Sequence, residues 1–183
     1  MLIQIITVDR SKRPEHEVRD LARRLEARGH DVVIQRFPAA RPYAGNSADV
    51  GEVVGAIWES DRACFEYARQ RRAPYTLILE DDCEIDELGC LDTAEAFIAQ
   101  HPGEVDMFFL GASPNCWWTT TADDRVVKYS HVYWWHAVIF TRSFKLNPAC
   151  FKMFSRFFHT QLACSSMVFG TLPLGFMPTS PAV

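Results

Sequence analysis

The sequence predicts an α/β fold, a Rossmann-like mixed sheet that is mostly parallel and has antiparallel strands toward its C-terminus. In the first 110 residues, short apolar runs alternate with amphipathic helical patterns, which is typical of parallel strands joined by helices. Beyond them, β-branched and aromatic segments follow one another with turn residues between, which indicates antiparallel pairing. With 183 residues, 48% of them hydrophobic, the chain is long enough for a single domain over residues 1–183.

The chain opens with a strand–helix–strand unit. Leu2–Val8 is an uninterrupted run rich in β-branched residues, and Asp31–Phe37 is a second strand. Between them, Pro14 suits the first turn of a helix and Gly29 its end. The apolar residues of this helix recur at helical spacing: Val18, Leu21, Ala22 and Leu25. Such a unit predicts two parallel strands joined by a right-handed crossover.

A loop and a long helix come next. Residues 38–46 are rich in proline, alanine and glycine, which predicts a surface loop. Asp49 and Glu52 have the spacing of a capping box, and the arginines within residues 69–72 suit the C-terminal end of a helix dipole. Apolar residues form a helical stripe between these ends: Val53, Val54, Ile57, Trp58, Cys64, Phe65 and Ala68.

The most informative stretch is residues 74–82, an apolar run that ends in Glu80, Asp81 and Asp82. The run fits a strand buried on both faces, and ligands of open α/β sheets bind beyond the carboxyl ends of such strands. On an extended backbone Glu80 and Asp82 would point one way and Asp81 the other. Three crowded carboxylates repel one another unless they are compensated, and Mg²⁺ or Mn²⁺ is a suitable partner. A solvated acidic turn after a strand is the alternative.

The rest of the chain predicts six further segments. First come a helix with Leu91, Ala94, Phe97 and Ile98 that ends at residues 102–103, and a buried strand at 106–111. A hairpin of 117–121 with 125–130 and an aromatic strand at 132–141 follow. The last two are a helix from Asn147 with a phenylalanine stripe and an irregular or edge-strand tail at 171–183. The phenylalanine stripe is interpreted as core packing rather than a cofactor site.

Composition excludes several classes of protein. A net charge of -4 has the wrong sign for a general nucleic-acid binder. The six cysteines contain no C-x-x-C pair, so neither a zinc cluster nor a disulfide framework is indicated. The apolar start is too short for a signal peptide and no later run is long enough for a transmembrane segment. Together with cysteines that are reduced by default, this predicts a cytoplasmic protein.

Four sequence elements together resemble glycosyltransferase family 25, the lipopolysaccharide and collagen-type galactosyltransferase-like group. They are residues 8–13, an Asp-Arg-Ser element after the first strand; residues 78–82, an Ile-Leu-Glu-Asp-Asp element; Leu110 with Gly111; and residues 136–139, a His-Ala followed by apolar residues. The Glu-Asp-Asp element is the most specific. This sequence departs from the family at Ser60, which is followed by Asp61 rather than histidine, and around residues 160–166, which lack an acidic residue.

The resemblance implies a nucleotide-diphospho-sugar (A-type) glycosyltransferase fold and a metal-dependent transfer reaction. A UDP-sugar would be the donor, and a hydroxyl on a glycan, lipooligosaccharide or protein the acceptor. Mn²⁺ or Mg²⁺ would be held by Glu80 and Asp82 and would neutralise the leaving diphosphate. Asp81 would contact the ribose or a metal-bound water, and Arg10 and Arg13 would contact uracil-ribose or the diphosphate. The residues assigned to the donor are Val8, Asp9, Arg10, Arg13 and Asp81.

An inverting transfer also needs a general base for the acceptor hydroxyl. His136 is the first candidate, because it interrupts an apolar strand within a family-like element, although a histidine there also fits a satisfied core residue. Asp124 is the second, although acids in a hairpin turn also occur for turn geometry alone. Arg10 and Arg13 likewise fit a solvated basic loop.

Two other functions remain open. The chain is also consistent with a catalytically inactive relative that binds a sugar nucleotide or a partner protein. A phosphoryl-transfer or hydrolytic enzyme with the same carboxylates has less support, because no phosphate-binding glycine loop follows the first strand.

Overall fold

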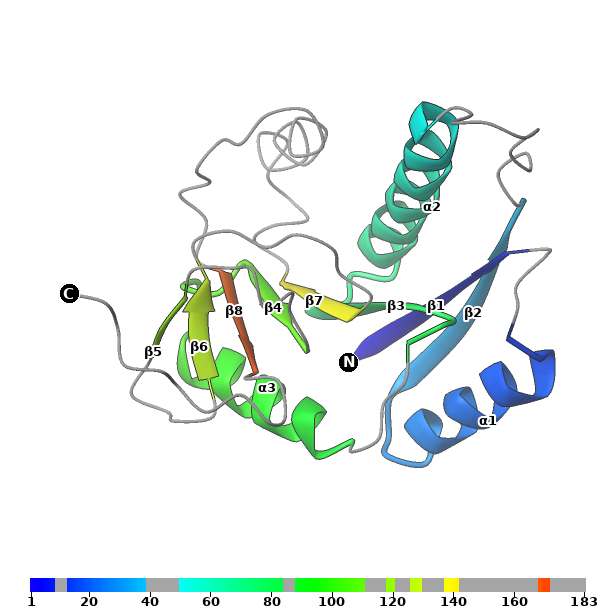
Figure 1. The fold of residues 1–183 in the computed structure, drawn as a ribbon. Helices are drawn as coiled ribbons and strands as arrows, with labels where there is room; N and C mark the ends of the chain where they lie inside the picture. The colour runs from blue at the N-terminus through cyan, green and yellow to red at the C-terminus, as the bar shows by residue number, and fades with distance from the viewer. Residues whose placement is uncertain are drawn as a thin grey trace.

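The computed structural model describes residues 1–8, 13–38, 50–83, 88–110, 118–120, 126–129, 137–141 and 168–171. These residues form an α/β arrangement around one mixed sheet with the strand order β2-β1-β3-β7-β4-β8-β6-β5 (Figure 1). The elements are β1 (Leu2–Val8), α1 (Glu15–Glu26), β2 (Asp31–Phe37), α2 (Val50–Gln70), β3 (Tyr75–Glu80), α3 (Gly89–Gln100), β4 (Met107–Phe109), β5 (Trp118–Thr120), β6 (Val126–Tyr129), β7 (Ala137–Thr141) and β8 (Val168–Thr171).

The sheet starts parallel and becomes mixed after its third strand. β1 lies between β2 and β3 and is parallel to both. β7 is antiparallel to its two neighbours, β3 and β4, so β4 runs in the same direction as the first three strands. β8 is parallel to β4, and β6 and then β5 add antiparallel pairs. The carboxyl ends of β1, β2, β3 and β4 therefore lie at one edge of the sheet.

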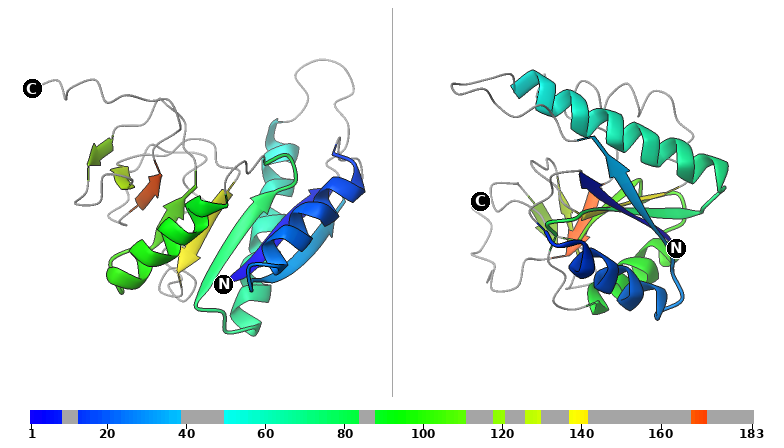
Figure 2. Two further views of the ribbon diagram at one scale, coloured as in Figure 1. Left: turned by 90° about the horizontal axis from the view of Figure 1, so that it is seen from below. Right: turned by 90° about the vertical axis from the view of Figure 1, so that its right-hand side faces the viewer.

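The three described helices cover the two faces of the sheet unequally. α2 lies on one face, whereas α1 and α3 lie on the other, as the turned views show (Figure 2). The α1 and α3 side encloses an apolar cluster to which β1 contributes Ile3 and Ile5 and β3 contributes Leu77 and Leu79. Since side chains alternate along a strand, the residues between these face α2.

The early elements confirm the sequence predictions closely. β1 and β2 have the predicted bounds and are parallel. Pro14 precedes α1, and Gly29, with a φ of 84°, follows it, a backbone conformation that glycine adopts without strain. The predicted apolar residues of the first and third helices are the ones that are buried: Val18, Leu21, Ala22, Leu25, Leu91, Ala94, Phe97 and Ile98.

The late elements confirm the predictions in part, and the sequence predicted no order for them in the sheet; β8 is parallel to β4, although antiparallel strands were expected there. The hairpin is confirmed as β5 paired with β6. The aromatic strand is described only over Ala137–Thr141, where it is β7 and inserts between β3 and β4. β8 lies in a region for which no internal strand was predicted. The predicted loop at 38–46 (beyond Pro38), the helix from Asn147 and the tail beyond Thr171 lie outside the described residues.

Candidate functional site

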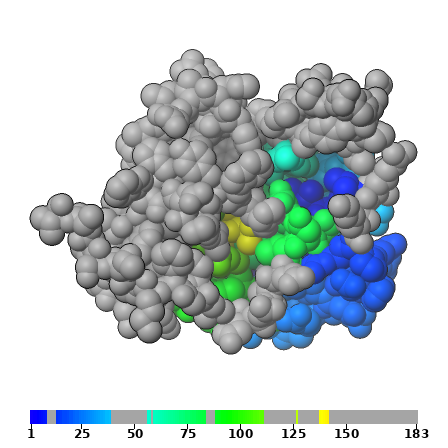
Figure 3. Space-filling model, viewed as in Figure 1, coloured from blue at the N-terminus to red at the C-terminus, as the bar shows by residue number. Residues whose placement is uncertain are grey.

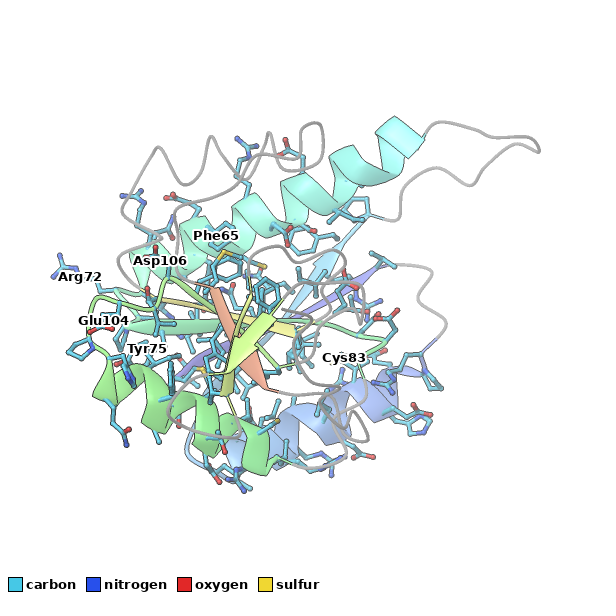
Figure 4. All side chains as sticks on the ribbon, turned by 60° about the vertical axis from the view of Figure 1, so that its left-hand side comes forward. Phe65, Arg72, Tyr75, Cys83, Glu104 and Asp106 are labelled. Atoms are coloured by element: carbon cyan, nitrogen blue, oxygen red, sulfur yellow. The ribbon has the colours of Figure 1, made fainter. Side chains whose placement is uncertain are left out.

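The candidate site lies where β3 ends. Glu80, the last residue of β3, is in register with Ile6 of β1, and Val8 ends β1 at the same edge of the sheet. The backbone N–H of Cys83 donates to the carbonyl oxygen of Glu80 at 3.1 Å and closes a turn through Asp81 and Asp82. Figure 4 shows Cys83 at the opposite end of the sheet from Tyr75, which begins β3.

This turn corrects one expectation for the three acids. The predicted alternation of Glu80 and Asp82 against Asp81 requires an extended backbone, whereas the strand ends at Glu80. Glu80 is half-buried at the end of β3, and Asp82 is exposed in the turn. Asp81 is half-buried, and its Oδ2 atom is buried without a hydrogen-bond partner. The acids therefore differ in environment because the chain turns, not because a strand continues.

Arg13 joins the chain after β1 to the acidic turn. Its Nη1 donates to the carbonyl oxygen of Cys83 at 2.9 Å, and its Nε lies 3.4 Å from Oε2 of Glu17, one helical turn further along the chain. In Figure 3 the green surface at the end of β3 adjoins the blue surface of β1 and of the start of α1. Among the predicted donor contacts, the structure thus brings Val8, Arg13 and Asp81 to one edge.

Asp61 on α2 is a residue of this site that sequence reasoning missed. It is 2% exposed, and its Oδ2 atom is buried without a hydrogen-bond partner. Burial first, and then the nearby Glu80 carboxylate, raise the pKa of Asp61 to about 8. A signal was present in the sequence, because Asp61 interrupts the apolar helical stripe between Ile57 and Cys64.

The two thiols close to these acids are held neutral. Burial and the Asp61 carboxylate raise the pKa of Cys64 to about 12, and burial with the nearby Asp82 and Glu80 raises that of Cys83 to about 11. A thiolate is the nucleophilic and metal-binding form of cysteine. The carboxylate oxygens near these thiols are donors that hard cations prefer.

The donor set determines which cation these residues fit. Within the ranges that the structure describes, no three histidine, cysteine or acidic side chains gather into one metal-binding group. Mg²⁺ and Mn²⁺ do not need such a cage, because they commonly bind through one or two carboxylates and complete their shell with water and phosphate oxygens. The orphaned oxygens of Asp61 and Asp81 are donors of the required kind.

The other predicted site residues are not described. Asp9, Arg10, Asp124 and His136 lie outside the described residues. β7 begins directly after His136, and its first residue, Ala137, pairs with Leu79. The chain therefore enters β7 at the sheet edge that carries the acidic turn.

The comparisons with known proteins add no identification. No model of a known protein family matches the chain, and no curated protein matches it significantly. The resemblance to glycosyltransferase family 25 therefore stays a prediction. None of the helices in the described ranges has both the length and the apolar character required to cross a membrane.

Proposed function

We propose that this protein is a metal-dependent glycosyltransferase of the A-type fold that transfers a sugar from a UDP-sugar to a hydroxyl acceptor on a glycan, lipooligosaccharide or protein. The observation that supports it most is the acidic turn after β3, which shares a sheet edge with the end of β1. A mixed sheet with a parallel start agrees with this fold.

The acidic turn suits the charge change of glycosyl transfer. The diphosphate leaves with negative charge as the bond between sugar and oxygen breaks, and a bound Mn²⁺ or Mg²⁺ supplies Lewis-acid stabilisation without proton transfer. Glu80 and Asp82 would hold the cation, and Asp81 would contact the ribose or a water bound to the cation. Arg13 ties the turn to the chain after β1, which orients the acids relative to the donor.

His136 and Asp124 remain the proposed general bases for the acceptor hydroxyl. The entry of β7 at Ala137, opposite Leu79, favours His136 of the two. A histidine suits this role because imidazole exchanges protons near neutral pH.

The test is a turnover assay on the full chain with Mn²⁺, a panel of nucleotide sugars and mixed oligosaccharide acceptors. We expect thermal stabilisation by one nucleotide sugar and release of its nucleoside diphosphate. Asp82→Ala should lower the release rate by about 10²–10³-fold, the size of effect seen when a charge-stabilising group is removed. Asp20→Ala, an exposed acid on α1, is the matched control and should not change the rate.

A second function is supported by the sequence around residues 160–166, which has no acidic residue where family 25 often has one. It is a non-catalytic relative that binds a sugar nucleotide or a partner protein. Stabilisation without nucleoside diphosphate release would identify the binding relative. No stabilisation by any nucleotide sugar would contradict both functions.

A further inference from the structure

We infer that a divalent cation at the end of β3 is bound directly by two carboxylates, Asp61 and Glu80, with Asp82 on the exposed side of the site. The inference deepens the proposed function and rests on it for the role of the cation in the reaction. Three observations support it: the hydrogen bond that fixes the position of α2 along β1, the strand register, and the orphaned oxygen of Asp61.

A hydrogen bond from Gln4 fixes the position of α2 along the direction of β1. The Nε2 of this buried side chain donates to the carbonyl oxygen of Cys64 at 2.8 Å. From Gln4, two residues along β1 lead to Ile6, which is about 6–7 Å nearer the carboxyl edge. From Cys64, three residues back along α2 lead to Asp61, about 4.5 Å along the helix axis.

These two displacements run the same way. α2 leads into β3, which is parallel to β1, so moving toward the N-terminus of α2 approaches the carboxyl edge of the sheet. Ile6 is in register with Glu80. Measured along the strand direction, Asp61 on α2 therefore lies at nearly the same position as Glu80 on β3.

Register also places Glu80 on the face that α2 covers. Gln4, which bonds α2, is paired with Ile78, and paired residues of a sheet share a face. Glu80 lies two residues beyond Ile78 and points to the same side. Leu79 points to the other side, into the cluster under α1 and α3. Two carboxyl groups from different elements thus approach each other on one face.

The Asp61 carboxyl lacks the partners that such burial requires. The side chain is 2% exposed and its Oδ2 has no hydrogen bond, and leaving a buried group of this kind unsatisfied destabilises the fold, more so when the group is charged. Within the described residues, the charged group that acts most on Asp61 is another carboxylate, Glu80. A positive ion between them would satisfy the orphaned oxygen and remove the repulsion in one step.

The surroundings select a hard cation. The donors are carboxylate oxygens, which suit Mg²⁺ and Mn²⁺, and those ions keep coordination positions for water and phosphate. Cys64 follows Asp61 by one helical turn, but its thiol stays protonated because burial raises its pKa to about 12.

The experiment titrates Mn²⁺ alone into the full chain and follows free Mn²⁺ by electron paramagnetic resonance. We expect Asp61→Asn to weaken binding at least tenfold. Glu59→Gln is the matched control, since Glu59 is an exposed acid on the same helix that pairs with Arg62, and it should leave the affinity unchanged. Asn has the shape of a protonated aspartate, so the variant should fold, and Asp61→Ser serves as a second variant.

A second readout separates a ligand from a structural residue. Without metal, Asp61→Asn should melt at the same temperature as the wild type or higher, because it removes an uncompensated acid. A purely structural role would lower the melting temperature instead and would contradict the inference. Mn²⁺ should raise the melting temperature of the wild type more than that of the variant.

The outcomes distinguish this inference from the proposed function. Equal Mn²⁺ affinity in the wild type, Asp61→Asn and Asp61→Ser would overturn the role of Asp61 while leaving the transferase proposal intact. Absence of Mn²⁺ binding by the wild type would overturn both the role of Asp61 and the metal dependence of the reaction. Weakened Mn²⁺ binding in the variants, with no nucleoside diphosphate release by the wild type, would support Asp61 and reject the transferase.

Discussion

The two faces of the sheet are built from the same strands but differ in chemistry. Under α1 and α3, Ile5, Leu79 and Phe108 join an apolar cluster. Under α2, the alternate positions include Gln4 and Thr76, both 0% exposed, and Glu80 at the strand end. The helix that covers this second face adds two buried polar residues of its own, Ser60 and Asp61.

The difference indicates that the two faces have different roles. Among the described residues, the cluster under α1 and α3 is built from hydrophobic side chains, so it serves stability. On the α2 face, Gln4 and Ser60 find partners in the carbonyls of Cys64 and Ile57, whereas Asp61 keeps an orphaned oxygen. Buried polar groups without partners are costly, and functional sites are one of the places where they occur. The α2 face therefore leads toward the candidate site.

The largest effect on stability should come from the apolar face. Phe108→Ala removes a ring that is 0% exposed and lies 6.0 Å, centroid to centroid, from Phe97. We expect the free energy of unfolding to fall by about 3–5 kcal/mol, because the ring's transfer energy is lost and a cavity remains. Urea denaturation measures this change.

Mn²⁺ affinity of the folded Phe108→Ala protein should not change, since the α2 face is untouched. Ile34→Ala on the edge strand β2 is the control, and its loss should be much smaller because Ile34 is 39% exposed. A change in Mn²⁺ affinity of Phe108→Ala as large as that of Asp61→Asn would contradict the different roles of the two faces.

The second-largest effect should be the pH dependence of the free energy of unfolding of the metal-free protein. The pKa of an unfolded aspartate is near 4, whereas burial and Glu80 raise that of Asp61 to about 8, so between these values the folded state holds the extra proton. Stability from this group is complete below pH 4 and is lost as the pH rises through 8. In EDTA, raising the pH from 5 to 7 should lower the free energy of unfolding by up to ~1.4 kcal/mol per pH unit.

Asp61→Asn should remove that slope, and the comparison of the two proteins isolates it. His30 acts with the opposite sign, because burial lowers its pKa and stability then rises with pH through its unfolded value. This contribution is common to both proteins and cancels in their difference. Equal slopes for the wild type and Asp61→Asn would show that the charge of Asp61 does not limit stability.

The smallest effect on stability should come from Gln4, a residue on the α2 face whose side chain has hydrogen-bond partners. Gln4→Leu removes the hydrogen bonds to the carbonyl of Cys64 and from Nε2 of Gln35 but adds apolar area. We expect a loss of about 1 kcal/mol, since a typical net hydrogen bond contributes about 0.5–1.5 kcal/mol. Chemical denaturation measures it, with Gln70→Leu at the exposed end of α2 as the control. A loss as large as that of Phe108→Ala would contradict this ranking.

The sequence by itself determined the local elements up to β4 and the acidic end of β3. Helical spacing identified the buried residues of α1 and α3, because one helix face must cover the sheet whatever lies beyond it. The alternation of β1, α1 and β2 predicted a parallel pair, since a helix between two strands returns the chain to the same edge. The hairpin of β5 and β6 was equally local.

Only the tertiary structure decided the order of the late strands and the surroundings of Asp61. The insertion of β7 between β3 and β4, and the pairing of β8 with β4, join segments far apart in the sequence, and neighbouring residues do not encode such contacts. In the sequence, Asp61 was visible as a break in an apolar stripe and as a departure from the family pattern after Ser60, and neither places it beside Glu80. Its approach to Glu80 depends on the register of β1 with β3 and on the position along β1 at which the Gln4 hydrogen bond fixes α2. Both are properties of the packed molecule.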